Sequence, residues 1–118
     1  MADHKELDVW KESMILTKEI YLLSKSFPKE ELYGLTSQIR RCSVSIPSNI
    51  AEGAARYSDK EFIQFLYIAL GSLAELETQI ILVTDFGFLK NNDILKKITS
   101  VRKMLVGLIK YLKNKSIK

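Results

Sequence analysis

The chain has 118 residues, of which 47% are hydrophobic and 27% charged, and its formal net charge is +4. This length suits one domain with a sizeable core, and the composition is that of a folded protein rather than a disordered chain. A single cysteine, Cys42, excludes an intrachain disulfide, and the first residues lack the apolar core of a signal peptide, so a cytoplasmic protein is expected. The most apolar stretch, residues 65–74, is about half a membrane span, so no transmembrane helix is expected.

The first predicted element is a helix over about residues 5–26. Apolar and small residues recur there at steps of three and four, which places them on one face of a helix. They are Val9, Ser13, Leu16, Ile20, Leu23 and Phe27. Phe27 and Pro28 end this helix, because the residue before a proline is disfavoured in the helical region.

The second predicted helix covers about residues 30–56 and contains a proline in its interior. Its apolar stripe runs straight through Pro47 and consists of Leu35, Ile39, Cys42, Ile46, Ile50 and Gly53. A proline inside a helix removes one backbone donor and costs roughly 3 kcal/mol. The hydroxyls of Ser43, Ser45 and Ser48 are suited to bond the freed backbone groups, so the sequence predicts one helix kinked at Pro47.

Two further helices are predicted over about residues 59–86 and 92–114. Ser58 and Glu61 have the spacing of a capping box at the start of the third helix, Gly87 ends it, and Asn91 or Asn92 caps the fourth. Both helices repeat apolar residues at alternating steps of four and three, which is typical of a bundle seam. The third helix carries a second apolar stripe, which indicates contact with a neighbouring subunit: Ile63, Tyr67, Leu70, Ala74 and Ile81.

No segment alternates apolar and polar residues as a half-buried strand does, so the chain is predicted to be all-α. Four helices joined by short connections favour neighbours that alternate in direction. The sequence therefore predicts an antiparallel up-down-up-down four-helix bundle that forms a single domain over residues 1–118.

Several motifs along these helices resemble one known family. They are Leu7-x-Val9-Trp10-Lys11, Phe27-Pro28, Tyr33-Gly34-Leu35-Thr36-Ser37-Gln38-Ile39-Arg40-Arg41, Ser45-Ile46-Pro47-Ser48-Asn49-Ile50-Ala51-Glu52-Gly53 and Ala69-x-Gly71-Ser72-x-x-Glu75-Leu76-Glu77. Together they span about residues 7–90 and resemble the 23S rRNA-intervening sequence proteins, also called S23 ribosomal proteins. The resemblance implies a bacterial four-helix bundle that assembles into a homopentameric ring. A relative serves as the accessory protein of diversity-generating retroelements, which implies RNA or a polymerase as a partner.

The sequence lacks the parts of a metal or catalytic centre. Its only histidine is His4, no Glu-x-x-His motif occurs, and Glu75 and Glu77 diverge on a helix, so no metal centre is predicted. Cys42 lies on an apolar stripe without a histidine to activate it and is interpreted as a small core residue. We therefore predict a protein that is not an enzyme, with no cofactor and no evident small-molecule substrate.

Charge is distributed unevenly along the chain. Residues 90–118 hold nine Lys or Arg and one acid, whereas residues 1–89 hold nine bases and thirteen acids. The last helix is therefore a basic rod, which suits phosphates, the acidic helices of a neighbouring subunit, or acids of its own bundle. Its candidate nucleic-acid-binding residues are Lys96, Lys97, Arg102, Lys103 and Lys110, and Lys113 and Lys115 extend the same basic surface.

On the second helix, Arg40, Arg41 and Arg56 are candidates for direct RNA contact, because guanidinium groups bind phosphates bidentately and stack on bases. The alternative is structural: Arg41 pairs with an acid and orients the second and third helices. The predicted structural polar cluster consists of Asn49, Glu52, Glu75 and Glu77. Asn49 is interpreted as an amide that bonds freed backbone at the kink rather than as a base reader.

Two functions remain open at this stage. The first is a non-enzymatic, ring-forming protein that binds RNA through basic surfaces. The second is a protein-interaction scaffold that self-assembles and recruits a protein such as a polymerase, without direct contact to nucleic acid.

Overall fold

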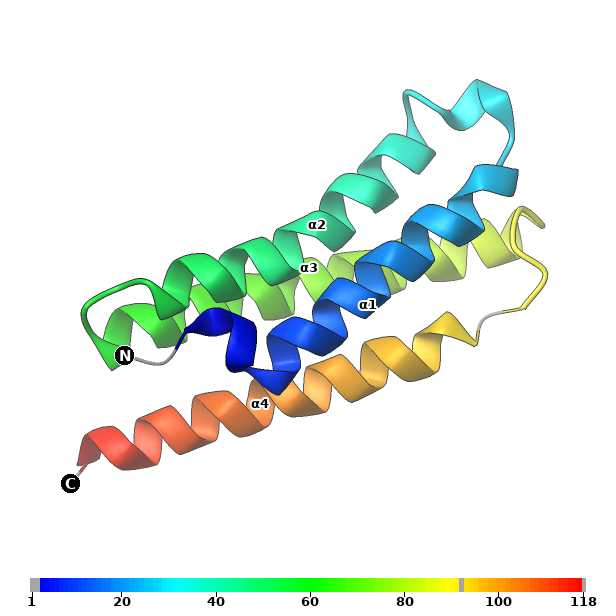
Figure 1. The fold of residues 1–118 in the computed structure, drawn as a ribbon. Helices are drawn as coiled ribbons and strands as arrows, with labels where there is room; N and C mark the ends of the chain where they lie inside the picture. The colour runs from blue at the N-terminus through cyan, green and yellow to red at the C-terminus, as the bar shows by residue number, and fades with distance from the viewer. Residues whose placement is uncertain (1–2, 92, 118) are drawn as a thin grey trace.

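The computed structural model describes residues 3–91 and 93–117, which contain four α-helices (Figure 1). They are α1 (Asp8–Leu23), α2 (Leu35–Ala54), α3 (Asp59–Asp85) and α4 (Ile94–Ile117). Short 3-10 helices precede α1 (His4–Glu6), follow it (Ser24–Ser26) and precede α2 (Lys29–Glu31). Because the described residues contain no strand, the predicted all-α fold is confirmed.

The four helices form an elongated bundle of 51 × 21 × 19 Å. Each helix packs against two others, in the cyclic order α1, α2, α3, α4, and the contact between α2 and α3 is the most extensive. In Figure 1 the connections between consecutive helices lie at alternate ends of the bundle, and α4 runs back alongside α1.

The ends of α3 follow directly from its sequence. The Ser58 hydroxyl accepts the backbone N–H of Glu61 at 3.2 Å and donates to the Glu61 carboxylate at 3.2 Å, which satisfies an amide of the first helical turn. At the other end, Gly87 adopts a left-handed φ of 82°, and its N–H and that of Phe88 bond carbonyls of the last turn. This is the Schellman arrangement, so both predicted boundaries of α3 are confirmed.

Other helix ends differ from the prediction. The second helix was expected from about residue 30, but a separate 3-10 turn occupies Lys29–Glu31, and Gly34, with φ −113° and ψ −110°, lies outside the helical region. Likewise, Leu7 is extended, so α1 begins at Asp8 rather than near residue 5. α4 continues to Ile117, past its predicted end near residue 114. The Asn91 side chain accepts the N–H of Asp93 at 3.2 Å, as a cap would, and Asn92 lies outside the described residues.

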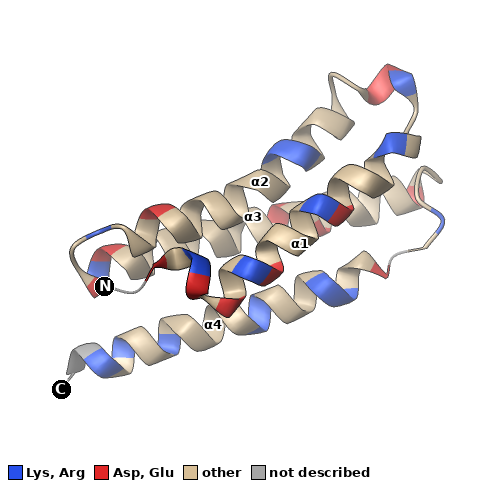
Figure 2. Ribbon diagram, viewed as in Figure 1, with Lys and Arg blue, Asp and Glu red and all other residues tan. Residues whose placement is uncertain are grey.

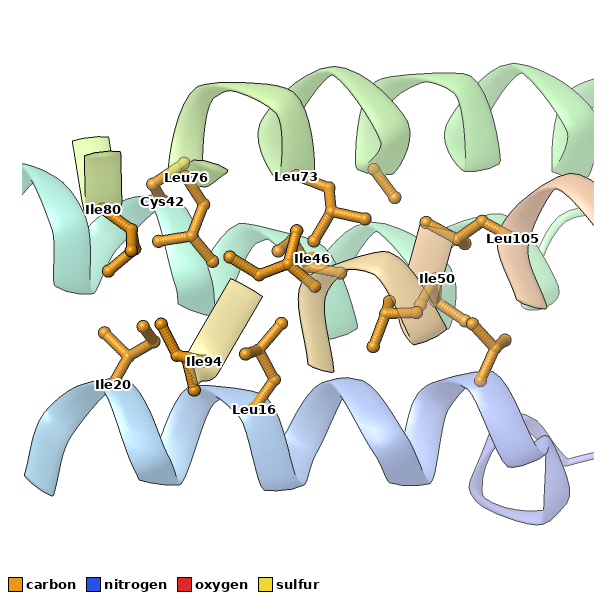
Figure 3. Packing of buried hydrophobic residues seen from close by; sticks show 14 of the residues in the cluster. Leu16, Ile20, Cys42, Ile46, Ile50, Leu73, Leu76, Ile80, Ile94 and Leu105 are labelled. Atoms are coloured by element: carbon orange, nitrogen blue, oxygen red, sulfur yellow. The ribbon is translucent and has the colours of Figure 1, made fainter. Parts of the chain in front are cut away.

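The core is built from the apolar faces that the sequence predicted, and all four helices contribute to it (Figure 3). Ile46 projects from α2 into this cluster and is fully buried, although it directly precedes Pro47. Other fully buried side chains are Leu16, Ile20, Ile39, Ile50, Leu66, Leu73, Leu76, Ile80, Ile98 and Leu105.

α2 continues as one helix through the buried Pro47. Proline has no N–H for the carbonyl of Ser43, four residues earlier. That carbonyl instead lies 3.0 Å from the Thr17 hydroxyl of α1, which shares its single hydrogen between Ser43 and the Ser13 carbonyl of its own helix, at 2.9 Å. The partners predicted from the sequence were wrong, because the hydroxyls of Ser43 and Ser45 bond carbonyls three residues earlier in their own helix. A bend at Pro47 stays a prediction.

The contact between Thr17 and Ser43 predicts a conditional effect on stability. Thr17→Val keeps the side-chain shape but leaves a buried carbonyl without its donor, so it should lower the free energy of unfolding by about 1–3 kcal/mol. In a Pro47→Ala background the restored backbone N–H can bond Ser43, and the same change should cost much less. Urea denaturation of the four chains measures this coupling. An equal cost in both backgrounds would contradict the assignment.

Within the described residues, α3 is the one helix that is long and apolar enough to cross a membrane, with a mean hydropathy of 1.5 over 18 residues. Packed core helices share this length and composition. In the bundle 39% of that window is buried, so much of the apolar surface of α3 faces outward.

Candidate nucleic-acid interface

Several basic residues of α4 are engaged within the bundle itself. Three of them form ion pairs with acids of α1 and α3: Lys97 with Glu19 (3.2 Å), Arg102 with Glu77 (2.8 Å) and Lys115 with Asp59 (3.6 Å). In addition, the ammonium group of Lys113 donates to the Tyr67 hydroxyl at 2.7 Å. These contacts join α4 to α1 and α3. Because they occupy four of the basic side chains of α4, fewer basic residues are free than the predicted continuous basic surface required.

The remaining lysines of α4 form a row on its solvent face. Lys96, Lys103 and Lys110 are exposed and have no ion-pair or hydrogen-bond partner within residues 3–91 and 93–117. They are seven residues apart, which places them on one side of the helix at intervals of about 10.5 Å. This side lies opposite the buried residues Ile98 and Leu105. Figure 2 shows Lys and Arg recurring along α4, with an acidic residue only at its start.

A second row with the same spacing runs along α1 and into the 3-10 helix Ser24–Ser26 that follows it; sequence reasoning missed this row. Lys11, Lys18 and Lys25 are also seven residues apart, exposed and without a partner among the described residues. The repeat of seven was visible in the sequence. α1 and α4 are neighbours in the bundle.

Arg40 and Arg41 are adjacent in sequence but lie in different settings. Arg40 is half-buried: its Nε donates to the Ser24 hydroxyl at 2.8 Å, and its guanidinium carbon lies 5.0 Å from the centre of the Tyr21 ring. Arg41 is exposed and makes one long hydrogen bond, of 3.4 Å, to Ser37. Within the described part of the chain, neither arginine forms an ion pair with an acid.

The predicted structural polar cluster is not formed. Glu52 pairs with Arg56 one turn later, at 3.8 Å, and Glu77 pairs with Arg102 of α4. The amide of Asn49 donates to a carbonyl of its own helix at 2.7 Å. The prediction considered residues of α2 and α3 alone. Glu77 instead pairs with a residue of α4, which packs against α3.

These contacts bear on two further arginine candidates. Arg41 pairs with none of the glutamates predicted for it, although it borders the same shallow groove as Glu75. Arg56 lies over the Phe65 ring, with 4.8 Å between its guanidinium carbon and the ring centre. Its pairing with an acid and an aromatic ring makes Arg56 a weaker RNA candidate than Arg40 or Arg41.

Cys42 is a buried thiol whose sulfur lies 2.9 Å from the carbonyl oxygen of Ser72. Burial, followed by the negative charge of Glu75, raises the pKa of this thiol to about 11. The group is therefore protonated at neutral pH, as expected of a core residue and not of a nucleophile. Among the described residues, no three His, Cys, Asp or Glu side chains gather as metal ligands would.

Fold and surface together define a class of protein: an all-α helical bundle with exposed rows of lysines on two neighbouring helices. The family model described as 23S rRNA-intervening sequence protein matches residues 5–107, and the chain belongs to this family. A crystal structure at 1.70 Å resolution shows a similar fold, with a TM-score of 0.79 and 28% sequence identity over 86% of this chain and 95% of that chain. It is a protein of unknown function from the S23 ribosomal protein family of Bacteroides thetaiotaomicron VPI-5482. No curated protein matches the chain.

Proposed function

We propose that this chain is a non-enzymatic, up-down-up-down bundle that self-associates into a ring and binds RNA through the lysine row of α4. A single observation carries the proposal: Lys96, Lys103 and Lys110 stay exposed and unpaired, while other bases of α4 are matched by acids. A row of exposed like charges creates a positive surface potential that attracts polyanions. The description of the family by its 23S rRNA-intervening sequence favours RNA as that polyanion.

The row suits the phosphate backbone of RNA rather than its bases. Lysines bind phosphates as point charges and release counterions, which gives affinity with little dependence on sequence. In a ring each copy repeats the row, so weak contacts combine if one RNA reaches several subunits. The family resemblance favours a pentamer as the ring.

Self-association is supported by the outer face of α3. This helix and its C-cap residue expose five large apolar side chains: Tyr67, Ile68, Ile81, Leu82 and Phe86. Exposed apolar side chains of this size are often found at protein–protein interaction sites. A second copy of the chain would bury this face.

Neutralising the row predicts a specific loss of RNA affinity. With Lys96, Lys103 and Lys110 all replaced by Gln, the slope of log affinity against log salt for single-stranded RNA should fall by about 2, because three phosphate contacts are lost. Fluorescence anisotropy at several salt concentrations measures both the affinity and the slope.

The matched control replaces three exposed, unpaired lysines that lie in separate segments, namely the 3-10 helix before α2, the first turn of α3 and the connection between α3 and α4: Lys29, Lys60 and Lys90. This variant loses the same net charge but should retain most of the slope. If both triple variants lose affinity and slope equally, RNA responds to net charge alone and the row is not the interface.

The scaffold is the second candidate, and the exposed apolar face of α3 favours it equally, because a different protein can cover the same side chains. A scaffold should keep its assembly mass after nuclease treatment and should bind RNA no better than heparin. The RNA-binding proposal requires RNA affinity that depends on Lys96, Lys103 and Lys110.

A further inference from the structure

A groove of about 520 Å³ lies between the end of α1 and the first half of α2. Its wall combines two arginines with aromatic, aliphatic and hydroxyl side chains: Tyr21, Leu32, Tyr33, Ser37, Arg40, Arg41 and Val44. None of these residues is acidic, so the groove concentrates positive charge without an internal counter-charge. Its volume lies in the range of small-molecule sites.

Arg40 is held in a fixed orientation in this groove. The hydroxyl of Ser24 donates to the backbone carbonyl of Tyr21 at 3.2 Å, and its oxygen accepts Arg40 Nε–H at 2.8 Å. The Tyr21 ring supports the guanidinium group from one side, at 5.0 Å. Both terminal nitrogens of Arg40 have no partner among the described residues, so a preoriented pair of donors is available to a ligand.

Arg41 brings a second positive charge to the same groove, with Ser37 and Val44 between the two arginines on the helix surface. Arginine pairs recognise phosphate because the planar donor fork matches two phosphate oxygens. At the rim, the Tyr33 side chain is 94% exposed and has no hydrogen-bond or ring partner in the described chain. An aromatic face in this position suits stacking against a nucleobase.

We infer that this groove binds one nucleotide unit, with its phosphate on Arg40 and Arg41 and its base against Tyr33. The inference deepens the proposed function, because an RNA strand is one source of such a unit and a free nucleotide is the other. Ser24 and Tyr21 are positioning residues that hold the guanidinium group of Arg40.

Isothermal titration of the full chain with adenosine 5′-monophosphate tests the inference. Adenosine, inorganic phosphate and succinate serve as comparison ligands. Arg40→Gln should weaken binding of the monophosphate about ten-fold or more, because it removes a charge-assisted hydrogen bond. Tyr33→Ala should weaken binding of the monophosphate but leave binding of inorganic phosphate unchanged, and it should leave the fold intact because Tyr33 is exposed. The control is Lys60→Gln, outside the groove, which should leave binding of the monophosphate unchanged.

Binding of a short oligoadenylate distinguishes between RNA and a free nucleotide as the source of the bound unit. If RNA supplies it, the oligoadenylate binds the parent chain more tightly than the monophosphate does. When Lys96, Lys103 and Lys110 are replaced by Gln, the oligoadenylate should bind only as tightly as the monophosphate. If the oligomer binds no better, the site takes a free nucleotide. The inference is overturned if adenosine or succinate binds as well as the monophosphate, or if Arg40→Gln has no effect. If RNA binds through the lysine row of α4 but the monophosphate does not bind, the inference about the groove is wrong and the proposed function stands. If neither RNA nor the monophosphate binds, both the inference and the proposed function are wrong.

Discussion

Ile46→Ala is expected to lower the free energy of unfolding by about 2–5 kcal/mol, the largest effect of any single truncation proposed for this chain. The side chain is fully buried in a cluster to which all four helices contribute (Figure 3), so removing its methyl and methylene groups loses burial and leaves a cavity. Urea or thermal denaturation at a fixed protomer concentration measures the loss, because self-association makes stability depend on concentration.

Two further variants serve as comparisons for Ile46→Ala. Ile46→Val removes one methylene group and should cost only about 0.5–1.5 kcal/mol. Leu22→Ala truncates a side chain that is 64% exposed, and it should stay within about 0.5 kcal/mol of the parent chain. A loss at Leu22 as large as that at Ile46 would contradict the assignment of the core.

Gly53→Ala is expected to destabilise the protein by about 1–3 kcal/mol, although alanine is the better helix former. An added Cβ would lie 2.6 Å from the Cβ of Phe65 and 2.9 Å from the ring of Phe62. Because a Cβ is fixed to the backbone, α2 and α3 must move apart to accommodate the methyl group. Glycine at this position therefore permits a close approach of these two helices.

The matched control is Gly107→Ala on α4, where nothing lies within 4 Å of an added Cβ. There the lower backbone entropy of the unfolded alanine chain should raise stability by about 0.5–1 kcal/mol. The same chemical change thus has opposite signs at two helical positions. Stabilisation by Gly53→Ala would show that the helices pack less closely than the structure indicates.

Features that depend on neighbouring residues in the chain could be predicted from the sequence. The start and end of α3 each depend on a few adjacent residues, Ser58 with Glu61 and Gly87 with its flanking amides. The apolar periodicity of the helices likewise identified most of the buried residues. The start of α2 was missed because the 3-10 turn at Lys29–Glu31 leaves no distinct pattern in so short a segment.

Features that depend on the register between helices could not be predicted. The donor for the Ser43 carbonyl is Thr17, which lies on a different helix and becomes a partner only once α1 packs beside α2. The ion pair between Glu77 and Arg102 requires the alignment of α3 with α4. Composition indicated that the last helix was basic, but only the packed bundle separates its paired bases from its unpaired lysine row.

The most direct test of RNA binding through α4 is to purify the tagged protein from its native cells at low salt and sequence the associated RNA. The variants are the Gln triple at Lys96, Lys103 and Lys110 and the scattered Gln triple at Lys29, Lys60 and Lys90. We predict RNA enrichment with the parent chain and the scattered variant, and its loss in the row variant at unchanged assembly mass. Equal enrichment in all three chains, or none in the parent chain, would contradict the account.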